Sequence, residues 1–246
     1  MRTIAIGDIH GCSKALRTLI EAISPTSEDT LICLGDYVDR GPDSRGVVDL
    51  LMELDSRCKL ILVRGNHELM FLGSALRGCD PVLWFQMGGQ ATLTSYGGNL
   101  QKISHNHLEF LDQKCVPFWE TEEYLFVHAN YLPDLPLARQ PEFQLYWEHL
   151  TDRLPTPHIS GKTVICGHTP QLGGYIADFG YLKCLDTYCF GGQYLTALDL
   201  QNDQIWQANK SGFQRHELEP WSVMQRRIGF LLKMFFGWGK GKRKTR

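Results

Sequence analysis

Five short apolar segments recur along the chain, and each runs directly into a polar cluster. The segments are TIAI (3–6), TLICL (30–34), LILV (60–63), YLFV (124–127) and TVIC (163–166). Their lengths and their β-branched and aromatic residues predict buried β-strands. The clusters that follow them are GDIHG, GDYVDRG, RGNHE, HAN and GHT. Asp, His and Asn side chains therefore stand where the predicted strands end.

Two amphipathic patterns between the first three strands predict helices. The apolar positions are Leu16, Leu19, Ile20 and Ile23 in the first pattern and Val47, Leu50, Leu51 and Leu54 in the second. We expect Ser13 and Ser44 to be the N-cap residues. Alternating strands and helices predict an α/β architecture with parallel strands, in which the loops at the carboxyl ends of the strands converge on the active site.

The rest of the chain departs from this alternation. Residues 69–120 have mostly helical patterns with glycine-rich turns, so we expect an insertion that covers or flanks the site. After Pro170 the sequence alternates and turns in the manner of antiparallel strands.

The composition is that of a globular protein. Hydrophobic residues make up 43% of the 246 positions, and no apolar run approaches the roughly 18 residues of a membrane span. The sequence opens on a strand rather than on a signal-peptide pattern. The eight cysteines lack C-x-x-C spacing and several lie in apolar segments, which favours reduced, buried thiols. We therefore expect a cytoplasmic protein.

Basic residues are concentrated near the C-terminal end. Residues 221–246 contain eight Lys or Arg and no Asp or Glu, although the whole chain has a net charge of −2. The remaining body is therefore acidic, which argues against nucleic acid as a partner. Apolar residues of the segment 221–246 fall on one helical stripe. This amphipathic basic helix and tail either docks on the acidic body, which is slightly favoured, or contacts the inner face of the membrane.

Six residues in the polar clusters are oxygen or imidazole donors, namely Asp8, His10, Asp36, Asn66, His128 and His168. Such donors suit Mn, Fe or Zn, and the absence of Cys among them disfavours a structural zinc site. Six ligands are too many for one tetrahedral ion but fit two octahedral ions that share a carboxylate. Paired ions roughly 3.5–4 Å apart stabilise the attacking and the leaving oxygen in phosphoryl displacement.

The charge of this site favours a phosphate substrate. Two divalent ions outweigh the charges of Asp8 and Asp36, and Arg40 adds a guanidinium that can hold two phosphate oxygens. A water activated by the ions serves as the nucleophile. His67, held as imidazolium by Asp39, is the expected proton donor to the leaving group.

GDIHG, GDYVDRG, RGNHE and GHT, in this order, resemble the signature of the phosphoprotein phosphatase (PPP) family of calcineurin-like metallophosphoesterases. The resemblance spans about residues 3–200, and GGQATLTSYG is similar to the small bacterial members. It implies a central mixed β-sandwich flanked by helices, forming a catalytic domain over residues 1–220. It also implies that Asp8 and His10 bind the first metal and that Asp36 bridges to the second, which Asn66, His128 and His168 bind.

The resemblance also implies His67 with Asp39 as the acid pair, and it implies residues that contact the substrate phosphate. The family has a second phosphate-binding arginine near a Trp before GHT. The expected phosphate contacts are Arg40, Asn66 and Arg153, with Arg139 as a weaker candidate than Arg153. The loop HAN departs from the His-Gly-Gly or His-Ala-Gly of many members.

These residues predict a dinuclear metal-dependent phosphomonoesterase with two divalent ions, for which we expect Mn²⁺, with Fe or Zn as alternatives. The expected activity is that of a protein serine/threonine phosphatase that also accepts phosphotyrosine, with a phosphorylated protein or a small phosphoester as substrate. An alternative is the hydrolysis of dinucleoside polyphosphates, as in the bacterial diadenosine tetraphosphatases that share these motifs. A third hypothesis, a non-catalytic metal-binding scaffold, is disfavoured by the intact acid pair.

Several further polar positions have a structural interpretation. Arg64 in RGNHE is expected to form a structural ion pair, and His105 and His107 are expected to lie in a solvated loop rather than to bind metal. The residues that either line the cleft or pack in turns are Tyr175, Tyr188 and Asp186.

Overall fold

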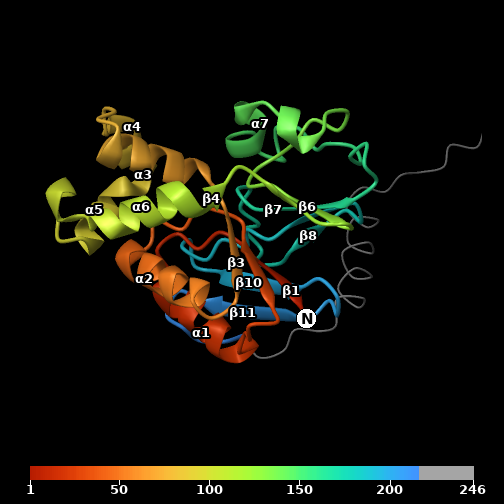
Figure 1. Ribbon diagram of the computed structural model, residues 1–246, viewed down its shortest axis with the longest axis horizontal. Helices are drawn as coiled ribbons and strands as arrows, with labels where there is room; N and C mark the ends of the chain where they lie inside the picture. Colours follow the sequence, from red (N-terminus) through yellow and green to blue (C-terminus); the bar gives the residue numbers. More distant parts are fainter. Residues whose placement is uncertain (216–246) are drawn as a thin grey trace, which may run out of the picture. The chain divides into compact units, whose positions relative to one another are not determined.

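The computed structural model describes residues 1–215, which form two β-sheets with helices around them (Figure 1). All five predicted strands are present. Two sequence-based predictions, the end of the catalytic domain at residue 220 and the basic helix at 221–246, lie outside the described residues. In the described part of the chain, no helix is long and apolar enough to cross a membrane.

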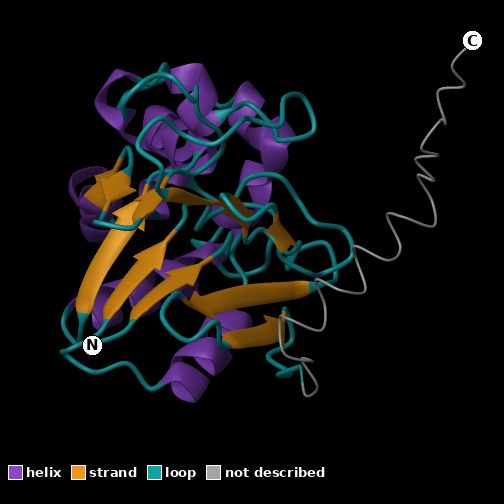
Figure 2. Ribbon diagram, turned by 90° about the vertical axis from the view of Figure 1, so that its right-hand side faces the viewer, coloured by secondary structure: helices purple, strands orange, loops and turns teal. Residues whose placement is uncertain are grey.

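Both sheets are mixed, as the resemblance implies (Figure 2). The first sheet has the order β11-β10-β1-β2-β3-β4, and β1 to β4 are parallel. Its strands are β1 (Thr3–Ile6), β2 (Thr30–Cys33), β3 (Lys59–Val63), β4 (Cys115–Val116), β10 (Tyr194–Asp199) and β11 (Ile205–Asn209). The second sheet has the order β5-β6-β7-β9-β8. Its strands are β5 (Trp119–Glu120), β6 (Tyr124–Phe126), β7 (Thr163–Cys166), β8 (Ala177–Asp178) and β9 (Leu182–Cys184).

The prediction of antiparallel strands after Pro170 is partly wrong. Strands β8, β10 and β11 each have antiparallel neighbours, but β9 also pairs in parallel with β7, with Val164 opposite Leu182. A parallel neighbour follows from the crossover that returns the chain to the second sheet, which no local alternation reveals.

Most helices cover the first sheet or form the insertion, whereas the helix at Glu142–Tyr146 packs in the core of the second sheet. The helices are α1 (Ser13–Ile23), α2 (Ser44–Asp55), α3 (Asn66–Leu76), α4 (Val82–Trp84), α5 (Gln90–Ser95), α6 (His105–Lys114) and α7 (Glu142–Tyr146), with the shorter segments η1 (Phe85–Gly89), η2 (Leu100–Lys102) and η3 (Leu137–Arg139). The predicted apolar positions of α1 and α2 are buried against the first sheet. Two hydrophobic cores result, one around the first sheet and one around the second.

Both N-cap predictions are wrong by one residue. The N-caps are Cys12 and Asp43, and Ser13 and Ser44 are the first helical residues. Asp43 accepts a hydrogen bond from the backbone N–H of Gly46 at 2.9 Å and another from the Ser13 hydroxyl at 2.6 Å. A carboxylate at this position satisfies a helix N–H group as well as a serine does.

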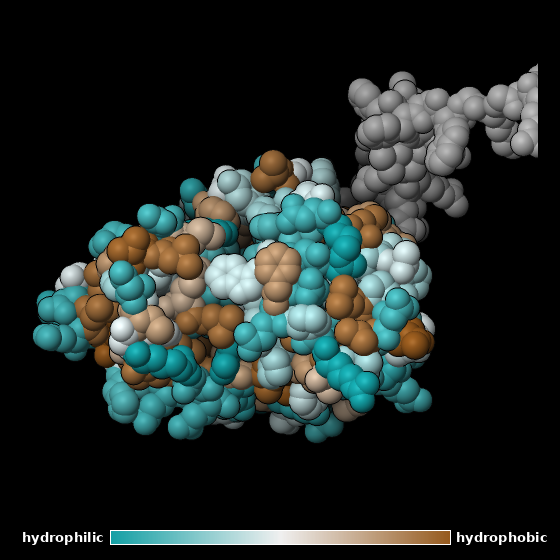
Figure 3. All heavy atoms as spheres, turned by 90° about the horizontal axis from the view of Figure 1, so that it is seen from above, coloured by the Kyte–Doolittle hydropathy of each residue, from teal (hydrophilic) through white to brown (hydrophobic). Residues whose placement is uncertain are grey.

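The insertion is mostly helical, as predicted, and ends in β4 and β5. The solvated loop expected at His105 and His107 is wrong, because both lie in α6. His107 is buried and contacts the Tyr96 hydroxyl at 2.8 Å and Asp49 at 3.1 Å. Figure 3 shows apolar patches over the end of the molecule that the insertion forms, where Val82 of α4 is 55% exposed.

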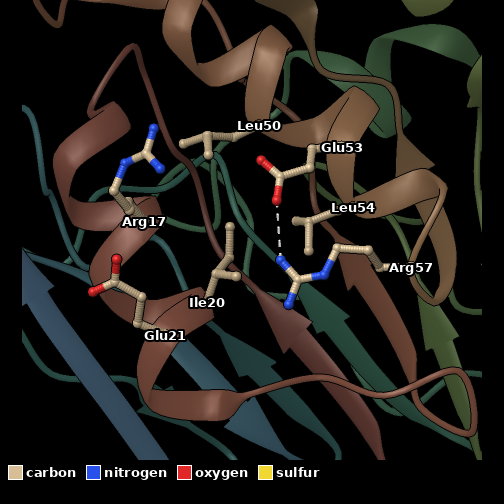
Figure 4. A pocket seen from close by; sticks show the side chains of 7 residues that line it. All are labelled: Arg17, Ile20, Glu21, Leu50, Glu53, Leu54 and Arg57. Carbon is tan, nitrogen blue, oxygen red and sulfur yellow. Dashed lines mark hydrogen bonds and ion pairs between the residues drawn. The ribbon is translucent and has the colours of Figure 1, made fainter.

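A pocket of about 160 Å³ lies between α1 and α2 (Figure 4). An ion pair of 3.2 Å between Glu53 and Arg57 crosses its rim. The lining residues come from the middle and carboxyl parts of both helices and from Arg57 just after α2, and these helices run back toward the amino ends of the strands. The pocket therefore lies at the opposite end of the first sheet from the polar clusters, and it is smaller than most ligand sites.

Candidate metal centre and active site

The carboxyl ends of five strands bring the six predicted donors together. Asp8 and His10 follow β1, Asp36 follows β2, Asn66 follows β3, and the two other histidines follow β6 and β7. Main-chain hydrogen bonds join the loops: the N–H of His10 donates to the Asp36 carbonyl at 2.7 Å. All six donors are buried. Parallel neighbours end at one edge of each sheet, so the loops of both sheets meet there.

Asp36 lies between two groups of donors. Its Oδ2 is 3.4 Å from His10 Nε2, and its Oδ1 is 3.3 Å from His128 Nε2. The ligand atoms of Asp36, His128 and His168 lie within 4.8 Å of one another, as do those of Asp36, His10 and His67. One carboxylate that belongs to two such clusters has the geometry of a bridging ligand.

Main-chain carbonyls fix the orientation of the three imidazoles. Nδ1 of His10 is 3.0 Å from the Val38 carbonyl, and Nδ1 of His128 is 2.8 Å from the Leu34 carbonyl. Nε2 of His168 is 3.1 Å from the carbonyl of Trp147. A carbonyl only accepts, so each of these nitrogens carries the proton and the opposite nitrogen keeps a lone pair. Anchored histidines of this kind are typical of metal ligands.

The inward atoms of the second cluster are all electron-rich. His128 Nε2 is 3.1 Å from His168 Nδ1 and 3.2 Å from Asn66 Oδ1. Burial lowers the pKa of His128, and it lowers the pKa of His168 to about 3, so both rings are neutral. Lone pairs that face one another at these distances repel unless a cation lies among them.

Asp8 and His10, the donors that follow β1, also favour a bound cation. Burial raises the pKa of Asp8 well above its ordinary value, and the carboxylates of Asp186 and Asp36 add to the rise. Asp8 Oδ1 has no hydrogen-bond partner among residues 1–215, although it is buried. Burial lowers the pKa of His10 well below its ordinary range, so this ring is neutral as well. The donor set therefore fits divalent cations with oxygen and imidazole ligands.

Unusual backbone conformations are concentrated in these loops. His10, Asp36, Asp39, Arg40 and His168 all have positive φ angles, between 43° and 71°. Such conformations cost free energy in residues other than glycine, and they cluster at functional sites. The neighbouring glycines allow close approach, because a Cβ on residue 167 would lie 2.0 Å from Asp8 Oδ1.

His67 and Asp39 form the predicted pair in a fully buried position. His67 Nδ1 is 2.7 Å from Asp39 Oδ2, and both side chains are completely buried. Burial lowers the pKa of His67, but the charges of Asp36 and Asp39 outweigh this effect and raise it overall. His67 Nε2 has no hydrogen-bond partner within the described residues, and Asp36 Oδ2 lies 3.9 Å from it. Its proton is therefore directed at the metal centre.

The insertion supplies two residues that the sequence did not single out. Trp84 Nε1 donates to both oxygens of Asp39, at 2.9 and 3.0 Å, and the Thr92 hydroxyl donates to Asp39 Oδ1 at 2.6 Å. Two side chains of the insertion, through three hydrogen bonds, therefore hold the carboxylate that orients His67. A local signal could not identify them, because Trp84 and Thr92 are 45 and 53 residues from Asp39.

Glu68 and Asp186 are two further buried carboxylates at the site. Glu68 accepts from the backbone N–H groups of Asp36 at 2.8 Å, Tyr37 at 2.8 Å and Gly65 at 3.0 Å, and so shapes the loop after β2. Asp186 accepts from the Tyr188 N–H at 3.0 Å, and burial raises its pKa to about 7. Its Oδ2 is unpartnered in the part of the chain described.

Arg40 reaches the centre and Arg153 is engaged elsewhere. Arg40 Nη1 is 3.0 Å from His10 Nε2, so its guanidinium lies directly beside the donors of the candidate metal centre. Arg153 donates to Glu148 at 2.5 Å and to the Tyr131 carbonyl at 2.7 Å. Its role as a second phosphate ligand stays a prediction, as does that of Arg139 at the end of η3.

Two other interpretations can be compared with the structure. Arg64 donates to the carbonyls of Asp112 at 2.8 Å and Cys115 at 3.1 Å, so its role is structural, but the prediction of an ion pair with a carboxylate is wrong.

Tyr175 is 42% exposed, and the guanidinium carbon of Arg215 lies 4.5 Å from the centre of its ring. Asn130 of the HAN loop donates to the Arg153 carbonyl at 2.9 Å, which fixes that loop.

Comparisons with known proteins identify the class. The chain is 28% identical, over 292 aligned positions, to a protein of Nitrosospira multiformis named symmetrical bis(5'-nucleosyl)-tetraphosphatase, and the match covers 88% of this chain and 99% of that protein. A protein of the same name from Proteus mirabilis is 46% identical over 74 residues, which is 30% of this chain. Serine/threonine-protein phosphatase 1 of Salmonella typhimurium is 42% identical over 85 residues, which is 34% of this chain. The last two matches span only 26% and 37% of those proteins.

Solved structures show the same fold. A crystal structure titled as a putative diadenosine tetraphosphatase superposes with a TM-score of 0.65 at 26% identity, over 84% of this chain and 92% of that one. The cold-active protein-tyrosine phosphatase of a Shewanella species has a TM-score of 0.63 at 15% identity, over 87% of this chain and 79% of that one.

The fold and the family together define a metal-dependent phosphoester hydrolase. The sequence profile of the calcineurin-like phosphoesterases matches residues 1–193, and the chain belongs to that family.

Proposed function

We propose that this chain hydrolyses dinucleoside tetraphosphates with two divalent ions, Mn²⁺ being the expected metal, and cleaves them symmetrically into two nucleoside diphosphates. The observation that supports a pair of ions is Asp36, whose two oxygens face separate donor clusters. The substrate is supported by the tetraphosphatase of Nitrosospira multiformis, which this chain matches over nearly the whole length of that protein.

The residues divide the work of the reaction. Asp8, His10 and Asp36 would hold one ion, and Asp36 would share the other with Asn66, His128 and His168. Bound ions supply positive charge and an activated water at the phosphate. Arg40 would hold non-bridging phosphate oxygens with two N–H groups of its guanidinium.

His67 completes the cleavage. The attacking water loses one proton to solvent as its oxygen forms a new P–O bond, and the P–O bond to the leaving group breaks with its electron pair on the leaving oxygen. The His67 Nε2 proton is directed at the centre and neutralises that oxygen. Asp39 keeps the ring oriented and favours its protonated form before the transfer.

Protein serine/threonine phosphatase activity, including phosphotyrosine, is the second candidate. An alkoxide leaving group requires a proton much more than a nucleoside diphosphate does, so a buried acid pair favours phosphoserine and phosphothreonine. The 42% identity to the Salmonella phosphatase over 85 residues supports the same activity.

Product analysis separates the two candidates. The protein, supplied with Mn²⁺, is incubated with diadenosine tetraphosphate and, separately, with a panel of phosphopeptides. We expect ADP as the only nucleotide product and a kcat/KM above that for every phosphopeptide. A mixture of ATP and AMP would contradict symmetrical cleavage, and faster release of phosphate from the peptides would replace the proposal by the second candidate.

A further inference from the structure

A pocket of about 560 Å³ opens beside the metal centre at Arg40. Its size lies within the usual range for sites that bind small molecules. The residues that line it are Arg40, Gly41, Pro42, Gln90, Ala91, Thr94, Phe190 and Lys210. They come from the loop after β2, from helix α5, from the loop before β10 and from the turn after β11. The proposed reaction does not use this space.

Phe190 connects the pocket to the candidate active site. Its ring packs edge to face against the imidazole of His10, with 4.9 Å between the ring centres. The guanidinium carbon of Arg40 lies 4.8 Å from the centre of the same ring. A phosphate held by Arg40 would therefore have the mouth of the pocket directly beside it, and the remainder of the substrate could extend into it.

The walls combine planar and polar groups. Nucleic acid bases stack on aromatic rings and on guanidinium planes, and the Arg40 guanidinium lies over the Phe190 ring, so these two groups already form a stacked pair that a base would extend. Gln90 and Thr94 are exposed on α5 and offer an amide and a hydroxyl to a base edge or a ribose. Lys210 is exposed and has no ion-pair partner within residues 1–215, so its charge is available to a phosphate.

The insertion holds this wall in place. The Arg40 N–H donates to the Gly88 carbonyl at 3.2 Å, and a Cβ on residue 88 would lie 2.8 Å from Arg40 Cγ. Gly88 has a φ of 108°, which favours glycine at this point of closest approach. A pocket fixed in this way is formed before any ligand binds, which reduces the entropy cost of binding.

We propose that this pocket binds the nucleoside of a nucleotide substrate, with the base stacked beside Phe190 and the adjoining phosphate between Lys210 and Arg40. The proposal deepens the proposed function and rests on it for the identity of the substrate. It assigns a specificity role to α5 and to the loop that contains Phe190, neither of which supplies a predicted metal ligand. A phosphopeptide side chain has no base to stack, so it would gain little from these walls.

A comparison of two inhibitors, ADP and pyrophosphate, tests the pocket without requiring a nucleotide substrate. ADP and pyrophosphate both carry a diphosphate, but only ADP carries a nucleoside. Their inhibition constants are measured against hydrolysis of p-nitrophenyl phosphate by the full chain with Mn²⁺. We expect ADP to bind about ten-fold more tightly than pyrophosphate, as one base stack would produce.

Three variants test which residues cause the preference for ADP over pyrophosphate. Phe190→Leu keeps an apolar side chain but removes the ring, and we expect it to remove most of the preference for ADP. Lys210→Gln should weaken the binding of ADP about three-fold, because an exposed charge contributes little to binding. Lys59→Gln is the matched control, because Lys59 is an exposed lysine at the start of β3 that does not line the pocket. Metal content is measured for each variant, so that a loss of ions is not mistaken for a loss of stacking.

The outcomes distinguish the pocket from the proposed substrate. Equal inhibition by ADP and pyrophosphate, or a preference that Phe190→Leu leaves unchanged, overturns the pocket. A native protein that prefers ADP through Phe190 but leaves diadenosine tetraphosphate intact supports the pocket and refutes the proposed substrate. Cleavage of that substrate without a preference for ADP refutes the pocket alone.

Discussion

Trp84→Phe tests whether the insertion controls the proton donor. The substitution keeps an aromatic ring against Phe71 and Phe85, whose ring centres lie 5.5 and 5.1 Å away, but it removes the N–H that Asp39 accepts. Hydrogen bonds to charged groups contribute about 1.5–3 kcal/mol. Two donors to the Asp39 carboxylate, His67 and Thr92, stay in place. We therefore take the lower limit, about 1.5 kcal/mol, which corresponds to roughly ten-fold in rate.

The effect should depend on the leaving group. We expect Trp84→Phe to lower kcat about ten-fold for phenyl phosphate, whose phenolate leaves poorly without a proton, and much less for p-nitrophenyl phosphate. Steady-state rates on both esters, with Mn²⁺ present, give the ratio directly. Trp206→Phe is the matched control, since Trp206 is buried in the same core on β11 and makes no contact with the acid pair. An equal loss on both esters would refute the idea that Trp84 acts through Asp39 and His67.

Four other substitutions test the remaining roles. His67→Asn should leave the metal content unchanged and lower kcat for phenyl phosphate by about 100-fold; metal loss by elemental analysis would contradict its role as acid. Asp36→Asn should lower metal occupancy and remove nearly all turnover, and full occupancy would show that Asp36 does not bridge. Arg40→Ala should raise KM and lower kcat together, because the phosphate oxygens carry charge throughout the reaction; an unchanged KM would exclude a phosphate contact. Asp29→Asn should lower the free energy of unfolding at pH 7 by about 2 kcal/mol. The Arg2 side chain, bonded to Asp29 at 2.7 Å, lowers the pKa of Asp29, so this contribution is present in full above the ordinary carboxyl pKa, declines as the pH falls below about 4 and is lost as the pH falls through the lower folded-state pKa. Urea unfolding that shows the same difference at pH 7 and pH 3 would contradict the ion pair.

Local secondary structure follows from the sequence more directly than contacts between remote segments do. Strands and amphipathic helices depend on local propensity and on the period of burial, which the sequence displays directly. The two predicted N-caps are each wrong by one position. At α2 the choice between Asp43 and Ser44 depends on a bond from Ser13 in another segment, and at α1 Cys12 is the N-cap without a side-chain hydrogen bond. The environment of His107 was missed for a similar reason: its partners, Asp49 and Tyr96, lie on other elements.

The amino-acid sequence by itself determined the strands, the order of the donor clusters, the pairing of His67 with Asp39 and the class of chemistry. These features follow from side-chain type at a strand end, and strand ends in a parallel sheet meet at one edge. The sequence could not show how far apart those side chains would lie.

Only the tertiary structure decided which atoms face one another. It placed the two oxygens of Asp36 toward different histidines, committed Arg153 to Glu148, and brought Trp84 and Thr92 onto Asp39. It also formed the pocket beside Arg40 from four separate segments. Such distances depend on the packing of elements remote in the sequence, and neither local propensity nor motif spacing contains that information.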